Sequence, residues 1–136
     1  EPLLQSLEEA KQLIENYADF DEVGYGRWAC VLKETQSIIG FCGLKYLPDL
    51  DAVDVGYRFL PQYWRRGLAT EACIASLEFG FATPGLHQII GLVLPDNTGS
   101  IRVLEKANMQ SEGRFVYDGF DVLRYVKRRQ SPDNIT

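Results

Sequence analysis

The sequence lacks the features of several large functional classes. Its 136 residues include a single histidine and three cysteines, Cys30, Cys42 and Cys73, with no Cys-x-x-Cys pair. An odd number of thiols inside apolar stretches predicts buried, reduced cysteines and no structural zinc site. No apolar run approaches the roughly 20 residues that a membrane-spanning helix needs. We therefore expect neither a metal nor a membrane partner.

An excess of positive charge is also missing. The chain has 19 acidic and 14 basic residues, a net charge of −5. Because binding to phosphate backbones requires clustered lysines and arginines, this balance argues against nucleic acid as a partner. The first residues contain neither a basic segment nor a signal-like apolar core, and we expect a cytoplasmic location. Without repeats or Gly/Ser linkers, residues 1–136 are expected to form one domain, with a frayed tail at 130–136.

The hydrophobic pattern predicts a single mixed sheet with helices. Helices are expected over residues 3–17, 68–82 and 98–107, and strands over 28–33, 37–47, 52–60, 87–94, 110–117 and 120–128. Asp118-Gly119 between the last two strands is typical of a two-residue hairpin turn. This order predicts a mixed α/β or α+β domain with helices packed on the faces of the sheet.

The segment after the third predicted strand is the most informative part of the chain. The run Trp64-Arg65-Arg66-Gly67-Leu68-Ala69-Thr70 leads directly into a helix. Its glycine permits a tight turn, and the small alanine lets a ligand approach the backbone. The first turn of the helix offers unpaired amides and the positive end of the helix dipole, and the two arginines add charge. This combination suits a dianion such as a pyrophosphate. The alternative is an ordinary helix N-terminus beside two solvated arginines.

Three blocks of the sequence, in order and at the right spacing, resemble the GNAT superfamily of N-acetyltransferases. In its coenzyme motif, Gln/Arg-x-x-Gly-x-Gly/Ala, Trp64 takes the first position, Gly67 the fourth and Ala69 the sixth. The tryptophan and the following Ala-Thr-Glu-Ala resemble the branch of bacterial ribosomal-protein N-terminal acetyltransferases (RimJ/RimL type). The strand segment 54–57 (DVGY) resembles that branch's acidic-x-Gly-Tyr, and 97–106 (NTGSIRVLEK) resembles its Asn-x-x-Ser…Glu-Lys helix.

The resemblance implies a fold. It is a mostly antiparallel sheet with a central, splayed parallel pair of strands and helices on both faces. The strand with which the superfamily usually begins is missing from this sequence. An exposed sheet edge invites pairing, so the N-terminus is truncated or another chain covers the edge, and a homodimer is one of the expectations.

The resemblance also implies acetyl-CoA as cosubstrate. The loop described above, 64–70, would hold its pyrophosphate. The pantetheine arm would lie in the splay and pair with the backbone of Phe59 and Leu60. Asn97 would bond the pantetheine amide, cap its helix, or do both. Lys106, with Arg102, would reach the phosphates or simply be solvated.

Acetyl transfer to an amine needs a base, a polarised thioester carbonyl and a proton for the departing thiolate. We expect Asp54 to be the base, with Glu71 as a rival, and an amide near Leu60 to stabilise the oxyanion. Many superfamily members carry a tyrosine at the position of Leu104, which cannot donate a proton. The branch resemblance moves this role to Ser100. The alternatives are an Asp54 that only faces solvent, a Ser100 that only belongs to a helix cap, and direct attack with diffuse proton transfer.

The resulting prediction is an N-acetyltransferase that moves an acetyl group from acetyl-CoA to a primary amine by direct attack on the thioester. The branch favours a peptide or protein α-amine as acceptor. The aromatic residues Trp28, Tyr46, Tyr57 and Phe59 could line the acceptor pocket or belong to the core. A different class, an acyl-CoA-binding module without turnover, stays open because the tyrosine and any site histidine are missing. A dinucleotide- or nucleotide-binding fold is disfavoured, since the glycine-rich phosphate loops it needs are absent.

Overall fold

The computed structural model describes residues 26–130. Within them the elements are β1 (Arg27–Leu32), β2 (Ser37–Leu47), β3 (Ala52–Phe59), the 3₁₀ helix η1 (Pro61–Tyr63), α3 (Leu68–Phe81), β4 (Gln88–Val93), α4 (Thr98–Lys106), β5 (Gln110–Tyr117) and β6 (Phe120–Arg128). Each of the strands and α-helices predicted for this part of the chain is present, and no boundary differs from the prediction by more than one residue. The short helix η1 was not predicted. The helix expected over 3–17 and nearly all of the expected tail lie outside the described residues.

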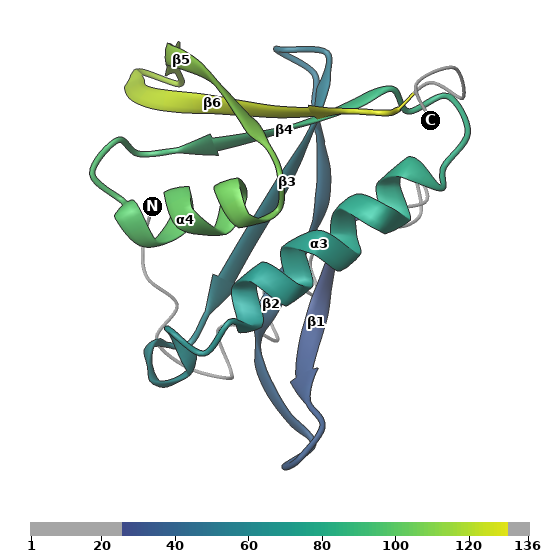
Figure 1. Ribbon diagram of the computed structural model, residues 1–136, viewed down its shortest axis with the longest axis vertical. Coiled ribbons are helices and arrows are strands. Elements are labelled where there is room, and N and C mark those ends of the chain that lie inside the picture. Colours follow the sequence, from purple (N-terminus) through teal and green to yellow (C-terminus); the bar gives the residue numbers. More distant parts are fainter. Residues whose placement is uncertain (1–25, 131–136) are drawn as a thin grey trace.

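The described strands form one sheet in the order β1-β2-β3-β4-β6-β5. Every neighbouring pair is antiparallel except β3 and β4, which run parallel and pair at one position only, Asp54 opposite Ile90. Figure 1 shows β3 running away from β4 toward its C-terminal end. The predicted mostly antiparallel sheet with a splayed central parallel pair is therefore confirmed, and the splay leaves strand backbone without a neighbouring strand.

Both described α-helices pack on the same face of the sheet (Figure 1). The main core lies between this face and the helices, and it includes Leu44, Val53, Val55, Ile89, Val93, Tyr125, Cys73, Leu77, Leu104 and Ala107. Since successive strand residues point to opposite faces, Ile90 next to Ile89 belongs to a second cluster, with Leu47, Ala52 and Val126. Helices on this second face stay a prediction, because the segment expected to supply them is outside the described residues.

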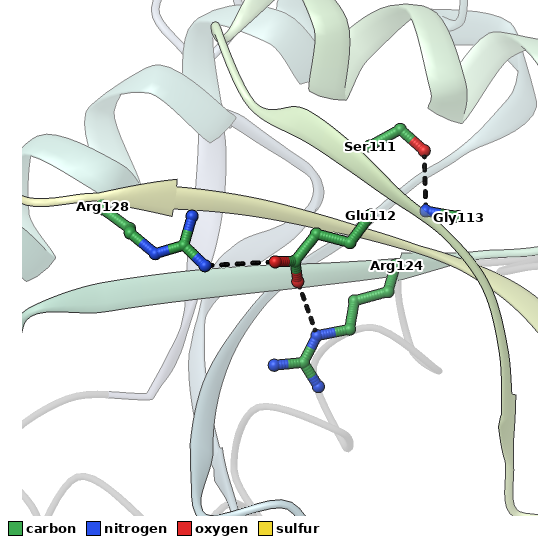
Figure 2. A network of polar contacts seen from close by, with 5 residues as sticks. All are labelled: Ser111, Glu112, Gly113, Arg124 and Arg128. Atoms are coloured by element: carbon green, nitrogen blue, oxygen red, sulfur yellow. Dashed lines mark hydrogen bonds and ion pairs between the residues drawn. The ribbon is translucent and has the colours of Figure 1, made fainter.

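The β5–β6 hairpin closes one edge of the sheet. Its turn residues Asp118 and Gly119 have φ of 52° and 80°, as the predicted two-residue turn requires. The ladder is irregular between Ser111 and Arg114, where Gly113 has φ 91°. At this irregularity the Glu112 carboxylate accepts hydrogen bonds from Arg124 (3.0 Å) and Arg128 (3.1 Å) of β6, as Figure 2 shows. The carboxylate thus ties the edge strand to its neighbour where backbone pairing is interrupted.

Candidate active site

A groove of about 850 Å³ lies where the end of β3, the start of α3 and the start of α4 meet. Nine of the eleven residues predicted to bind the coenzyme line it: Phe59, Trp64, Arg65, Gly67, Leu68, Ala69, Thr70, Asn97 and Lys106. Leu60 and Arg66 do not line it. The structure thus brings together two segments about 30 residues apart in the sequence.

The N-terminus of α3 opens into this groove, and its first amides have no hydrogen-bond partner within the helix. Gly67 occupies the N-cap in the left-handed region, with φ 77°, and no side chain caps the helix. The first bond of the helix runs from the Glu71 amide to the Gly67 carbonyl (3.1 Å). The amides of Leu68, Ala69 and Thr70 precede that bond and so have no partner within the helix. Together with the helix dipole they form a site for an anion.

The charge of the groove matches this geometry. Four basic residues line it, Arg58, Arg65, Arg102 and Lys106, and its lining in the described part of the chain includes no acid. Arg66, expected beside Arg65, instead lies over the ring of Tyr63 at 5.6 Å from its centroid. A chain with a net charge of −5 therefore has a locally cationic groove.

The backbone at the end of β3 corrects one expectation. The Leu60 amide donates to the Ile39 carbonyl (2.9 Å), so it points toward β2 and is not directed into the groove. The Leu60 amide is therefore not available to the pantetheine arm, and the oxyanion donor expected near Leu60 is not this amide. Because backbone groups alternate along a strand, the Phe59 amide points the other way, toward the splay. The Phe59 carbonyl accepts a hydrogen bond from the Trp64 indole (2.8 Å).

A second cavity, of about 710 Å³, is lined from both faces of the sheet, by Val55, Val93 and Leu104 of the main core and by Leu47 of the second cluster. It shares Tyr57, Arg58, Asn97 and Ser100 with the groove. The groove and this cavity, together called the two hollows, therefore meet at the splay between β3 and β4. Its other lining residues include Arg27, Lys45, Asp54, Gly56, Tyr117, Asp118 and Phe120. A molecule in the groove and a second one in this cavity could therefore approach each other at the splay.

Asp54 lines this second cavity, and its side chain is 13% exposed. Its carboxylate accepts a hydrogen bond from the Arg27 guanidinium at 3.0 Å. The rival base, Glu71, is exposed and lines neither hollow. Asp54 is thus the acid of the predicted pair that faces a cavity, and its role as a base stays a prediction.

Ser100 lies where the two hollows meet. Its amide donates to the Asn97 side chain (3.1 Å), which confirms the expected helix cap. Its carbonyl accepts a hydrogen bond from the Tyr57 hydroxyl (3.2 Å). Burial raises the pKa of Tyr57 well above its ordinary value, so this phenol stays neutral and remains a hydrogen-bond donor. Tyr57 therefore links β3 to α4 across the splay.

The thiols offer no nucleophile to this site. None of Cys30, Cys42 and Cys73 forms a disulfide bond, and none of them lines either hollow. Burial raises the pKa of Cys30 and of Cys73 to about 12, and it also raises that of Cys42. Because the thiolate is the reactive form, these side chains are unsuited to carry an acetyl group. The described residues contain no group of three or more His, Cys, Asp or Glu that could hold a metal, and none of their helices is long and apolar enough to cross a membrane.

Sequence reasoning missed several lining residues, above all Arg27. Nothing in the local pattern of β1 marks it, because it reaches Asp54, 27 residues away, only after β1, β2 and β3 pair. Of the four aromatic candidates, Tyr57 and Phe59 line a hollow. The Trp28 ring instead packs edge-on against the ring of Phe79, with 4.8 Å between the two ring centroids. The Tyr46 hydroxyl donates to Asp51 (2.7 Å), outside both hollows.

Known proteins share both the sequence and this architecture. The family model of the acetyltransferase (GNAT) domain matches residues 1–110. The chain is 32% identical over 112 residues to YoaA, an uncharacterized N-acetyltransferase of Bacillus subtilis (strain 168). The matched region covers 81% of this chain and 63% of that protein. It spans about 60% of the length of the curated relatives it matches.

Solved structures of acetyltransferases have a similar fold. A GNAT-family acetyltransferase from Bacillus anthracis superposes with a TM-score of 0.66 at 31% identity, over 75% of this chain and 65% of that one. The ribosomal-protein-S5-alanine acetyltransferase from Vibrio fischeri superposes with a TM-score of 0.71 at 23% identity, over 94% of this chain and 77% of that one; at this identity the likeness concerns the fold alone. From the family match, the sheet with its splayed parallel pair and the groove at the start of α3, we conclude that the chain belongs to the GNAT acetyltransferase family.

Proposed function

We propose that this protein transfers an acetyl group from acetyl-CoA to a primary amine. The observation that carries the proposal is the anion site at the start of α3. Three helix-terminal amides without a capping side chain open into a groove lined by four basic residues. Such a site is electrostatically matched to a pyrophosphate such as that of the coenzyme.

The groove suggests how the coenzyme would bind. Its pyrophosphate would accept hydrogen bonds from the amides of residues 68–70, with Arg65 beside them. Arg102 and Lys106 would face the remaining phosphate from α4. The pantetheine arm would run toward the splay, past Phe59 and Asn97. Since the Trp64 indole already donates to the Phe59 carbonyl, we expect the arm to share that acceptor or to displace the indole.

The chemistry follows from where the two hollows meet. The amine nitrogen would enter from the second cavity and attack the thioester carbon, forming a carbon–nitrogen bond as the carbon–sulfur bond breaks. Asp54, directly or through a water molecule, would accept the proton that the amine loses. The Phe59 amide, next to Leu60, would stabilise the oxyanion. Ser100 would donate a proton to the departing thiolate and regain one from solvent.

The acceptor class rests on the family branch. The coenzyme loop and the DVGY strand resemble the RimJ/RimL type, and the Vibrio fischeri protein of similar fold is named for a ribosomal-protein alanine. We therefore propose a peptide or protein α-amine as acceptor. A cytoplasmic location and a homodimer through a sheet edge stay predictions.

A calorimetric titration with acetyl-CoA tests the proposal directly. We expect wild-type protein to bind, and Gly67→Glu to lose binding, because it places a negative side chain at the anion site. Gly85→Glu is the matched control: Gly85 has a similar φ of 85°, also has nothing near an added Cβ, and lies outside both hollows. It carries the same backbone strain, so its affinity for acetyl-CoA should match the wild type.

Turnover is measured in the same samples by release of free CoA. The acceptors are short peptides that begin with alanine, serine or methionine, together with spermidine and kanamycin. Binding without release from any acceptor would support the non-catalytic coenzyme-binding module instead. No heat of binding with folded wild-type protein would overturn the proposed function altogether.

A further inference from the structure

The Arg27 guanidinium lies against Gly56 of β3, beside the second cavity. Gly43 of β2 and Gly56 of β3 stand opposite each other in register, and Arg27 of β1 pairs with Gly43. A Cβ on Gly56 would lie 2.6 Å from Arg27 Nη2, closer than real Cβ contacts come. A side chain at position 56 would therefore displace the guanidinium from this position.

The guanidinium makes three hydrogen bonds from this position. Nη1 donates to the Gly43 carbonyl (2.7 Å) and to the Asp54 carbonyl (3.3 Å), and Nη2 donates to the Asp54 carboxylate (3.0 Å). The Arg27 side chain is 14% exposed, against 13% for Asp54. Contacts to both the main chain and the carboxylate of one residue fix its side chain relative to the strand.

The position of this pair matters for the proposed reaction. Asp54 stands at the single position where β3 and β4 pair, next to the point at which they diverge. Arg27, Asp54 and Gly56 all line the second cavity, where the acceptor amine would enter. A small displacement of the carboxylate there would change its distance to the amine.

We propose that Arg27 is a positioning residue for Asp54, with Gly56 as the residue that makes room for it. The inference rests on the proposed function. In the acetyl transfer the proton passes from the amine to Asp54, and Arg27 forms and breaks no covalent bond. Its guanidinium holds the carboxylate in one orientation before the amine arrives. Loss of this orientation lowers the rate of the chemical step and leaves coenzyme binding unchanged, because Arg27 does not line the groove.

A purely structural tie between β1 and β3 is the competing explanation, and a set of variants separates the two. Arg27→Gln removes the charge and the paired donors, Arg27→Lys keeps the charge, and Gly56→Ala pushes the guanidinium aside without touching Asp54. The matched control is Arg124→Gln, which removes an arginine with the same 3.0 Å bond to a carboxylate, Glu112, outside both hollows. For each variant one measures kcat, KM for acetyl-CoA, KM for the best acceptor of the peptide and amine panel, and thermal unfolding.

The expected result is a selective loss of kcat. Arg27→Gln should lower kcat about 100-fold, the order of magnitude for a misplaced reacting group, with KM for acetyl-CoA within about twofold of the wild type. Arg27→Lys should recover part of that loss, and Arg124→Gln should keep the wild-type kcat. Gly56→Ala should lower kcat in the wild-type background and have no further effect in the Arg27→Gln background, because both changes act through one contact.

Each other outcome overturns the inference in a recognisable way. Wild-type kcat in Arg27→Gln removes the role of Arg27 and leaves the proposed function intact. Additive losses for Arg27→Gln and Gly56→Ala show that Gly56 does not act through Arg27. Loss of acetyl-CoA binding in both Arg27 variants, with lowered thermal stability, shows a structural tie only. Absence of turnover in the wild type with every acceptor overturns the proposed function, and the role of Arg27 with it.

Discussion

Ser100 of α4 lies where the two hollows meet, and Asp54 of β3 lines the second cavity beside it. The remaining candidates for acid–base chemistry are less well placed. Glu71 is exposed outside both hollows, and the three thiols, whose pKa values are raised by burial, line neither hollow. At the residue scale, the proposed chemistry thus depends on one carboxylate, whose orientation we propose an arginine holds, and on one serine in a helix cap.

This assignment predicts the behaviour of two variants. Asp54→Asn and Ser100→Ala should each lower kcat by about 100-fold or more, the usual contribution of a positioned acid or base, with little change in KM for acetyl-CoA. Asp51→Asn is the control, because Asp51 bonds Tyr46 on the β2–β3 turn, outside both hollows. Steady-state kinetics with the best acceptor of the panel provide the measurement. A Ser100→Ala variant with unchanged kcat would show that the thiolate leaves without a proton from this side chain.

At the scale of elements, the two helices of the site start in different ways. α4 begins with a conventional cap, in which the Asn97 side chain accepts the Ser100 amide. α3 begins at a glycine in the left-handed region and has no side-chain cap. Glycine at the N-cap costs only about a few tenths of a kcal/mol relative to a capping side chain, and it leaves the first amides of α3 open to the proposed ligand.

The β5–β6 hairpin allows a prediction about pH. The hydrogen bonds from Arg128 and Arg124 hold the pKa of Glu112 below its ordinary value. A carboxyl whose pKa is lowered by folding stabilises the protein above its unfolded pKa of about 4.3, and this contribution disappears as the pH falls through the lower folded value. Glu112→Gln should therefore lower the free energy of unfolding slightly at pH 7, by less than about 1 kcal/mol at this exposed site. At a pH low enough to protonate Glu112 in both the folded and the unfolded state, the variant should be as stable as the wild type.

Thermal unfolding at a series of pH values measures this difference. High salt should shrink it at pH 7, because exposed ion pairs are screened. A difference between wild type and Glu112→Gln that persists below the folded pKa would mean that packing, and not the ion pairs, accounts for the effect.

At the scale of the whole molecule, net charge and local charge have opposite signs. The chain carries −5, yet the groove is lined by Arg58, Arg65, Arg102 and Lys106, with no acid among its described lining residues. An overall negative charge weakly opposes the approach of an anionic coenzyme, while the focused positive groove attracts it at short range. Net charge alone therefore says little about the ligand.

Salt dependence tests this distribution of charge. Raising the ionic strength from about 0.05 to 0.5 M shortens the Debye length to a few ångströms, and the affinity for acetyl-CoA should fall several-fold. Dephospho-CoA, which lacks one phosphate, should show a smaller dependence if Arg102 and Lys106 face that group. Calorimetry at each salt concentration gives both slopes. If the affinities of the two coenzymes depend equally on salt concentration, Arg102 and Lys106 of α4 do not bind that phosphate.

The sequence alone determined the elements and the coenzyme loop. Strand and helix boundaries between residues 27 and 128 followed from hydrophobic period, from Asn97 as a cap and from Asp118-Gly119 as a turn, all of which act over a few residues. The loop 64–70 was recognisable for the same reason, since Gly67 and the helix that follows are contiguous. The tertiary structure alone decided which backbone and side-chain groups face the site.

Pairing with β2 turned the Leu60 amide away from the groove, and pairing of three strands brought Arg27 to Asp54 across two glycines. The divergence of β3 from β4 joined the two hollows at Tyr57 and Ser100. These features depend on contacts between residues far apart in the chain. Local propensity carries no information about strand register, so they could be known only once the sheet had formed.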